Sequence, residues 1–340
     1  MTVRNVVRKV RWGIAGLGKI AHRFAKDLTH NVTLGELHAV AARDLERASA
    51  FAEQYQSPKS YGTYTALAQD PEIDVVYVAT IHPLHKSLVA LFLAHGKHVL
   101  VEKPAFTNTE DWDEMSALAQ RQGLLLVEAM KTVTFPAYQA LRSFIHDNHI
   151  TLTSIEASFG NYHEFDPQQP LFNPTLSGGA TLDVGVYALW LYADLCQLMQ
   201  KTLIKPAVTI SRDNSTSEVD ENVTFHFSGA QHATLSGTLC ASITRHLPRE
   251  AVLKGPDVHI VIREKWWNPC HIEICYQGKE FTIEAPMLGG GFAYEIEHVS
   301  VLVQNNAQCS ELIPASTSRA VIALMEEALC EHGFSFLVHA

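Results

Sequence analysis

The chain has 340 residues, of which 47% are hydrophobic and 18% are charged, and its formal net charge is −10 with the histidines neutral. This composition excludes intrinsic disorder, and at roughly 150 residues per domain the length indicates two domains. The excess of acidic side chains argues against nucleic acid or an acidic membrane surface as a partner, and the chain lacks the apolar run of about 18 residues that a membrane-spanning helix needs.

Four basic side chains near the start of the chain resemble the first part of a signal peptide, namely Arg4, Arg8, Lys9 and Arg11. The next stretch, residues 12–18, is too short and too rich in glycine to form the apolar core of such a peptide. The six cysteines are scattered through the second half of the chain, as is typical of reduced thiols, and we predict no metal site. We therefore expect an unprocessed, cytoplasmic protein.

Residues 1–130 alternate between short apolar runs and helical segments. The apolar runs have the length of strands that are buried on both faces, and they lie at residues 10–15, 37–42, 74–79, 98–101 and 124–127. Helices are predicted between them, at residues 20–28, 45–55, 83–95 and 110–122. Such regular alternation predicts right-handed crossovers in an α/β fold with a doubly wound parallel sheet.

The pattern changes after Pro136. Helices are predicted at residues 137–147, 182–199, 294–302 and 318–331, and a strand is predicted at residues 154–159. From about residue 205 to residue 285, apolar and polar residues alternate, which is typical of antiparallel strands joined by short turns. We therefore predict two domains, residues 1–130 and residues 131–340, the second an α+β domain with a mainly antiparallel sheet.

A glycine-rich stretch follows the first predicted strand. Residues 16–21 have the sequence Gly-Leu-Gly-Lys-Ile-Ala, which matches G-x-G-x-x-G/A, and they open a predicted helix. In this context the first glycine allows a tight turn, the second lets a pyrophosphate approach the backbone, and the free N–H groups of the helix face the phosphates. We predict a Rossmann domain in which Gly16, Leu17, Gly18, Lys19 and Ile20 contact a dinucleotide.

The end of the second predicted strand bears on the choice between NAD and NADP. NAD sites usually have an acidic residue at the end of this strand, about 20 residues after the glycine-rich stretch, and its carboxylate binds the ribose 2′-hydroxyl. This strand ends at Ala42 and is followed by Arg43, which leaves room for a 2′-phosphate and supplies a cation for it. We therefore favour NADP, while NAD stays possible if Asp44 ends the strand instead.

Two further segments make a family resemblance specific. One is Glu102-Lys103-Pro104 after the fourth predicted strand, and the other is residues 178–187, which match G-G-x-x-x-D-x-G-x-Y. Together with the glycine-rich stretch, residues 79–85 and residues 291–297, they make the chain resemble the Gfo/Idh/MocA oxidoreductases from about residue 10 to residue 335. At position 187 the chain has a tyrosine, which resembles the branch of the dihydrodiol dehydrogenases and glucose–fructose oxidoreductase. Inositol dehydrogenases have a histidine at this position.

The resemblance implies that Lys103, Asp183 and Tyr187 meet at the nicotinamide end of the cofactor. A free tyrosine titrates near pH 10, and a lysine ammonium beside it favours the phenolate that a proton acceptor needs. Asp183 and Tyr187 are four residues apart, so on a helix they share a face. The resemblance also implies that residues 131–340 bind substrate and form the dimer with a large open sheet. Lys103 and four other residues are expected to contact the cofactor: Thr80, His82, His85 and Glu102.

His82 and His85 have the spacing of a metal-ligand pair. Because they follow a predicted strand at a helix start, where family members hold the cofactor, we favour cofactor contact or helix packing over metal binding. The substrate is expected to meet Lys131 and Tyr162. Residues 128–136 correspond to a stretch like E-A-x-W-T-R-F-x-P in the dihydrodiol dehydrogenases, and here Lys131 replaces the tryptophan and Val133 replaces the arginine. We therefore expect aromatic dihydrodiols to be poor substrates, unless Lys131 points to solvent.

These observations predict an NAD(P)-dependent oxidoreductase that transfers hydride between nicotinamide and a small sugar, cyclic polyol or diol. A catalytically silent dinucleotide-binding regulator and a glycosidase that uses bound NAD remain as alternatives. We also expect a homodimer or larger homo-oligomer, because one strand face in residues 222–239 is polar but uncharged, which suits packing against a second sheet better than open solvent. That face carries Thr224, His226, Ser228, His232, Thr234, Ser236 and Thr238.

Overall fold

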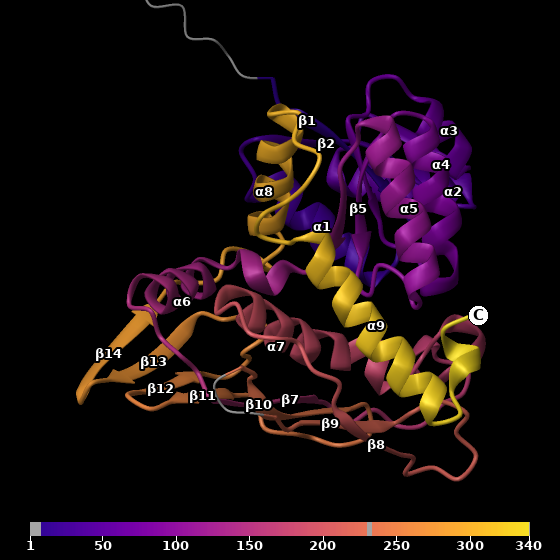
Figure 1. The fold of residues 1–340 in the computed structure, drawn as a ribbon. Helices are drawn as coiled ribbons and strands as arrows, with labels where there is room; N and C mark the ends of the chain where they lie inside the picture. The colour runs from indigo at the N-terminus through magenta and orange to yellow at the C-terminus, as the bar shows by residue number, and fades with distance from the viewer. Residues whose placement is uncertain (1–7, 230–232, 340) are drawn as a thin grey trace, which may run out of the picture. The chain divides into compact units, whose positions relative to one another are not determined.

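The computed structural model describes residues 8–229 and 233–339, and these divide into two compact units (Figure 1). The first unit comprises the described residues up to Glu102 together with Glu114–Lys131 and Leu288–Glu311. The second comprises Lys103–Asp113, Thr132–Met287 and the described residues from Leu312 onward. A late segment of the chain therefore returns to the first unit. Among the described residues, no helix combines the length and the hydropathy needed to cross a membrane.

The first unit is built on a six-stranded sheet with the order β3-β2-β1-β4-β5-β6, in which every paired strand is parallel. This confirms the predicted doubly wound sheet. Its strands are β1 (Val10–Ala15), β2 (Gly35–Ala41), β3 (Lys59–Tyr61), β4 (Val75–Val78), β5 (His98–Glu102) and β6 (Leu126–Ala129). Strand β3 was not predicted, because its three residues offer no apolar run.

The helices of this unit follow the predicted alternation with strands. They are α1 (Lys19–His30), α2 (Leu45–Tyr55), α3 (Tyr64–Gln69), α4 (His85–Ala94) and α8 (Ala293–Gln304), while α5 (Thr109–Gln122) begins in the second unit. Helix α8 belongs here because its start is fixed to α1 by a buried carboxylate. Asp27 is 1% exposed and accepts hydrogen bonds from the backbone N–H groups of Gly290 and Phe292, at 2.9 and 2.8 Å. Helix α8 also contacts β1, because Trp12 Nε1 on β1 donates a hydrogen bond to Ser300 Oγ on α8 at 3.1 Å.

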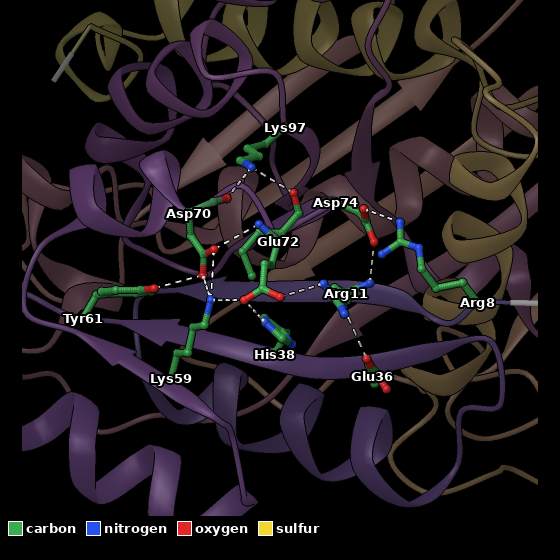
Figure 2. Close-up of polar contacts among 11 residues, drawn as sticks. Arg8, Arg11, Glu36, His38, Lys59, Tyr61, Asp70, Glu72, Asp74 and Lys97 are labelled. Carbon is green, nitrogen blue, oxygen red and sulfur yellow. Dashed lines mark hydrogen bonds and ion pairs between the residues drawn. The ribbon is translucent and has the colours of Figure 1, made fainter.

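Charged side chains close the amino ends of the parallel strands (Figure 2). Lys59 Nζ, at the start of β3, donates to both carboxylate oxygens of Asp70, at 3.0 and 3.1 Å. Lys97, just before β5, is 5% exposed, and its Nζ donates to the carbonyls of Asp70 and Ile73 at 2.5 and 2.9 Å. These groups lie at the edge opposite to the carboxyl ends of the strands, so we assign Lys97 a structural role.

The second unit is built on an eight-stranded sheet with the order β14-β13-β12-β11-β7-β10-β9-β8. All pairs are antiparallel except β7 with β10, which confirms the predicted mainly antiparallel sheet. The strands are β7 (Ser154–Gly160), β8 (Ala207–Ser211), β9 (Asn222–Phe227), β10 (Ser236–Ser242), β11 (Ala251–Gly255), β12 (Val258–Ile262), β13 (His271–Tyr276) and β14 (Lys279–Glu284).

Helices cover one face of this second sheet (Figure 1). They are α6 (Pro136–Asp147), α7 (Val186–Leu198) and α9 (Ala315–Glu331), of which α9 packs on α7. Helix α7 is buried on almost every side, as its apolar sequence requires. On the other face, β9 and β10 expose part of the expected polar set, including Thr224, His226 and Thr238. Thr234 is an exception because it is 7% exposed and lies before β10, and His232 lies outside the described residues.

Candidate active site

The turn between β1 and α1 has the form that a dinucleotide site needs. Gly16 has φ +90°, and a Cβ on it would lie 2.7 Å from Thr80 Cγ2 and 2.8 Å from the carbonyl oxygen of Ala79, so only glycine fits. A Cβ on Gly18 would meet no atom within 4 Å, so the backbone is open on this side. Helix α1 begins at the next residue, Lys19, and its first N–H groups point to this opening. Leu17 and Ile20 complete the predicted stretch.

Two arginines lie near this turn after the end of β2. Arg43 is exposed to solvent. Asp44 uses its carboxylate to cap α2, where Oδ1 accepts from the N–H groups of Glu46 and Arg47 at 2.9 and 3.3 Å. Arg47 was missed by the sequence analysis, and its Nη2 donates to the Leu17 carbonyl at 2.6 Å. Its place one helical turn after Arg43 is the signal that could have identified it.

The residues after β4 form the next part of the same sheet edge. The hydroxyl of Thr80 is buried, and it has no hydrogen-bond partner among residues 8–229 and 233–339. His85 is fully buried at the start of α4, with Nε2 3.1 Å from the Thr80 carbonyl oxygen, so its ring supports this turn. The ring of His82 lies 5.6 Å from that of His85 in an edge-on arrangement. Within the described part of the chain, no group of three or more His, Cys, Asp or Glu side chains could hold a metal ion.

Glu102 ends β5 at this edge, and it accepts a hydrogen bond from the hydroxyl of Tyr77. Strand order reverses between β1 and β4, and such a switch point is where doubly wound sheets bind their ligands. The structure therefore brings the predicted cofactor residues of the first unit to one edge of one sheet.

Lys131, expected to contact substrate, lies in a buried cluster of the first unit. It is 7% exposed, its Nζ lies 4.8 Å from the centre of the Phe292 ring, and the alternative that it points to solvent is wrong. Glu295 on α8 is fully buried, and neither of its carboxylate oxygens has a hydrogen-bond partner among the described residues. Burial lowers the pKa of Lys131 and raises that of Glu295, because both charged forms lose contact with water.

The glycine pair of residues 178–187 is explained by close packing in the second unit. A Cβ on Gly178 would lie 2.6 Å from the carbonyl oxygens of Pro170 and Leu171. Gly179 has φ +113°, and a Cβ there would lie 2.0 Å from Oδ1 of Asp220. After this pair, Thr181–Gly185 form a π-helical turn, which leads into α7. Turns of this kind often occur at functional sites.

The three residues expected to act together lie together in this second unit. Lys103 Nζ donates to the carbonyl oxygen of Asp183 at 2.6 Å and to its carboxylate Oδ1 at 3.2 Å. The same Nζ lies 4.9 Å from the centre of the Tyr187 ring. Sequence spacing could not bring Lys103 to the other two, since it precedes Asp183 by 80 residues. The arrangement places a positive charge over the ring of Tyr187, and a cation close to a phenol favours the ionised form that a proton acceptor needs.

Aromatic rings that the sequence analysis missed lie beside this group. The ring of Phe159 at the end of β7 lies 5.4 Å from that of Tyr187 and stacks on Trp267, with 3.7 Å between the ring centres and 9° between the planes. The adjacent tryptophans 266 and 267 were a sequence signal that could have identified this group of aromatic rings. Tyr162, two residues after β7, is 59% exposed, and its ring lies 6.4 Å from that of His246.

Comparisons with known proteins agree with this architecture. Residues 10–130 match the Gfo/Idh/MocA model of oxidoreductases with an NAD-binding Rossmann fold. The chain is 32% identical to trans-1,2-dihydrobenzene-1,2-diol dehydrogenase of Xenopus tropicalis, over 96% of this chain and 99% of that protein. It is 33% identical to the human protein of the same name, over 96% of this chain and 98% of that one.

Solved structures show the same fold at lower sequence identity. A 3-ketoreductase from Actinomadura kijaniata, solved with NADP and TDP-benzene, has a TM-score of 0.78 at 22% identity, over 94% of this chain and 96% of that one. An aldose-aldose oxidoreductase from Caulobacter crescentus, solved with glycerol, has a TM-score of 0.81 at 21% identity, over 96% of this chain and 98% of that one.

Proposed function

Because the chain belongs to the Gfo/Idh/MocA family of NAD(P)-dependent oxidoreductases, we propose that it transfers hydride between NADP and a small sugar, cyclic polyol or diol. The observation that carries the proposal is the position of the Lys103 ammonium, which bonds Asp183 and lies over the ring of Tyr187. Relatives named as dehydrogenases of a diol, and folds shared with enzymes of sugars, support a carbinol carbon as the reacting centre.

Each of the three side chains has its own part in the proposed reaction. The cofactor held at the edge of the parallel sheet would supply a hydride acceptor, NADP⁺, for oxidation and a hydride donor, NADPH, for reduction. Tyr187 takes the proton of the substrate hydroxyl during oxidation and returns it during reduction. The Lys103 ammonium stabilises the negative charge on the tyrosine oxygen, and Asp183 holds that ammonium through its carbonyl and its carboxylate.

The carboxyl edge of the parallel sheet fits a dinucleotide. The open side of Gly18, the unsatisfied hydroxyl of Thr80 and the exposed guanidinium of Arg43 are the observations that support this. We assign the pyrophosphate to the start of α1 and the 2′-phosphate to Arg43. The other residues assigned to the cofactor are Gly16, Leu17, Lys19, Ile20, His82, His85, Glu102 and Lys103.

Arg43→Ala is expected to weaken NADP binding by about tenfold or more and NAD binding hardly at all, since a hydrogen bond to a charged group contributes about 1.5–3 kcal/mol and only NADP carries the 2′-phosphate. Titrations of NADPH and NADH followed by cofactor fluorescence measure both affinities. Arg47→Ala is the matched control. Arg47 holds the glycine-rich turn through the Leu17 carbonyl, and this turn is common to NADP and NAD binding, so both affinities are expected to fall together. If Arg43→Ala weakens the binding of NADPH and NADH equally, the assignment of the 2′-phosphate to Arg43 is wrong.

A substrate panel read by the absorbance of the reduced cofactor tests the proposed function. We expect turnover with sugars or polyols, and a lower kcat/KM for a benzene dihydrodiol, because Lys131 replaces a ring surface whose stacking contributes about 0.5–1.5 kcal/mol beyond its buried area. A dihydrodiol that outperforms every sugar and polyol contradicts the specificity. If the protein binds NADPH but turns over no substrate, the result favours the catalytically silent regulator. If it cleaves a glycoside without a net change in cofactor absorbance, the result favours the glycosidase that uses bound NAD.

We propose that the protein is a homodimer that uses the open face of its eight-stranded sheet. This face offers neutral polar side chains on β9 and β10, where His226 Nδ1 and Thr238 Oγ1 lie 3.1 Å apart. It is hollowed by a cavity of about 490 Å³ whose lining includes Ser158, Cys240 and Val252. Light scattering at micromolar concentration is expected to give twice the chain mass or more. A monomeric mass contradicts the proposal, and the face is then an ordinary solvated surface.

We also propose that the protein works in the cytoplasm. All six cysteines are thiols in the structure, which suits a reducing compartment.

A further inference from the structure

A buried carboxyl lies at the start of the helical segment that carries Asp183 and Tyr187. Asp220, two residues before β9, is fully buried. Its Oδ2 accepts a hydrogen bond from the N–H of Thr181 at 2.7 Å, and its carbonyl oxygen accepts one from the N–H of Ala180 at the same distance. One residue thus fixes two consecutive N–H groups at the first turn, and no other side chain caps this end of the segment in the described part of the chain.

The same carboxyl explains why the second residue of the pair Gly178-Gly179 is a glycine. With φ +113°, Gly179 brings its Cα so close that a Cβ would stand 2.0 Å from Asp220 Oδ1. That oxygen is buried and has no hydrogen-bond partner among residues 8–229 and 233–339. Asp220 is therefore packed tightly against the turn, but only one of its two carboxylate oxygens, Oδ2, accepts a hydrogen bond there.

The surroundings of Asp220 allow its charge to change near neutral pH. Burial raises its pKa to about 7, and the hydrogen bonds from Thr181 oppose this increase. No charged side chain contributes to the shift among the described residues. The adjacent Glu221 turns its carboxylate away, to the backbone N–H groups of Asp213 and Asn214. An ionised carboxylate at a helix start is stabilised by the helix dipole and binds the first N–H groups more strongly than a neutral one.

We propose that Asp220 is a positioning residue for the reaction, because it fixes the turn on which Asp183 meets Lys103. The proposal rests on the function proposed above. When Asp220 is ionised, the turn is fastened at Ala180 and Thr181, and the Asp183 carbonyl stays 2.6 Å from Lys103 Nζ. When Asp220 is neutral, its hold on Thr181 weakens, the turn loosens, and the ammonium is less well placed beside Tyr187.

Asp220→Asn tests this, because the amide keeps an acceptor for Thr181 and removes the charge. We expect kcat above pH 7 to fall by about 10-fold to 100-fold, as is typical of a misplaced catalytic group, while the Kd for NADP is unchanged. The plot of log kcat against pH should also lose the ionisation near pH 7. Asp213→Asn is the control, since hydrogen bonds from Arg245 and Thr244 hold the pKa of this carboxylate at about 2, so the neutral range of its profile stays as in the wild type. A wild-type profile and kcat in Asp220→Asn overturn the proposal.

A measurement on the unmodified chain decides the question if Asp220→Asn does not fold. Amide hydrogen exchange of residues 178–187, corrected for the intrinsic effect of pH, should become faster as the pH falls from 8 to 6. Helix α9 serves as the internal reference and should not change. Constant protection of residues 178–187 overturns the proposal. If the wild type oxidises or reduces no member of the sugar, polyol and diol panel, the proposed function itself fails. If the wild type is active and Asp220→Asn has the same kcat and pH profile, only the role of Asp220 is removed.

Discussion

Tyr187→Phe is expected to lower kcat by about 10²–10⁴-fold, the range typical of a lost general acid–base group, and to leave the Kd for NADP nearly unchanged. The substitution removes one oxygen and keeps the ring, which packs 5.4 Å from Phe159 and beneath the Lys103 ammonium. The loss should therefore come from proton transfer and not from packing. Steady-state kinetics on the best substrate of the panel, together with a fluorescence titration of NADPH, measure the two quantities.

Tyr192→Phe provides a matched control on the same helix. Tyr192 is fully buried, and its hydroxyl donates to the Leu235 carbonyl at 2.7 Å, so its role is structural. This variant should lose about 0.5–1.5 kcal/mol of unfolding free energy and keep its kcat. If Tyr187→Phe lowers kcat by less than about tenfold, a group other than this tyrosine moves the proton.

Lys103→Met is expected to reduce kcat by about 10²-fold or more, because methionine has a similar length but no charge to stabilise the tyrosine oxygen. It also leaves the carbonyl and the carboxylate of Asp183 without the donor that now lies at 2.6 and 3.2 Å. Stopped-flow measurement of cofactor absorbance separates the hydride step from product release. A hydride step at the wild-type rate would show that this ammonium plays no part in the chemistry.

Lys97→Met is the control for that experiment, since the two lysines flank the same strand, β5. Lys97 Nζ donates to two carbonyls at the opposite edge of the sheet, so its loss should cost about 1–3 kcal/mol of unfolding free energy, measured in urea. Its kcat should remain that of the wild type. The pair of variants separates a lysine that stabilises the fold from one that serves the reaction.

The sequence predicted the elements whose signal is local. Strands β1, β4 and β5 are buried on both faces, so each appears as a short, mostly apolar run, and α7 appears as a long apolar helix. Strand β3 and helix α3 are short and depend on neighbours for their stability, and their own residues carry no such pattern. The return of residues 288–311 to the first unit depends on Asp27, which caps a turn far along the chain, and no local pattern contains that information.

The candidate site shows the same division. Tyr187, Asp183 and Lys103 could be named from a family motif, but only the fold shows that one ammonium bonds the aspartate and covers the ring. Arg47 and Asp220 act on backbone groups of distant segments, and a backbone partner leaves no mark in the sequence. Both side chains were therefore missed although each supports a predicted motif.

The attachment of α8 to α1 has a consequence for the way the chain is synthesised. A ribosome that has completed β6 has produced all six strands of the parallel sheet. The N–H groups that donate to the Asp27 carboxylate, and the Ser300 hydroxyl that accepts from Trp12 Nε1, are still to be translated. Until then the Asp27 carboxylate is not covered by this segment, and water takes the place of these N–H groups. Helix α8 can therefore pack on α1 and β1 only after Thr132–Met287 of the second unit have been synthesised.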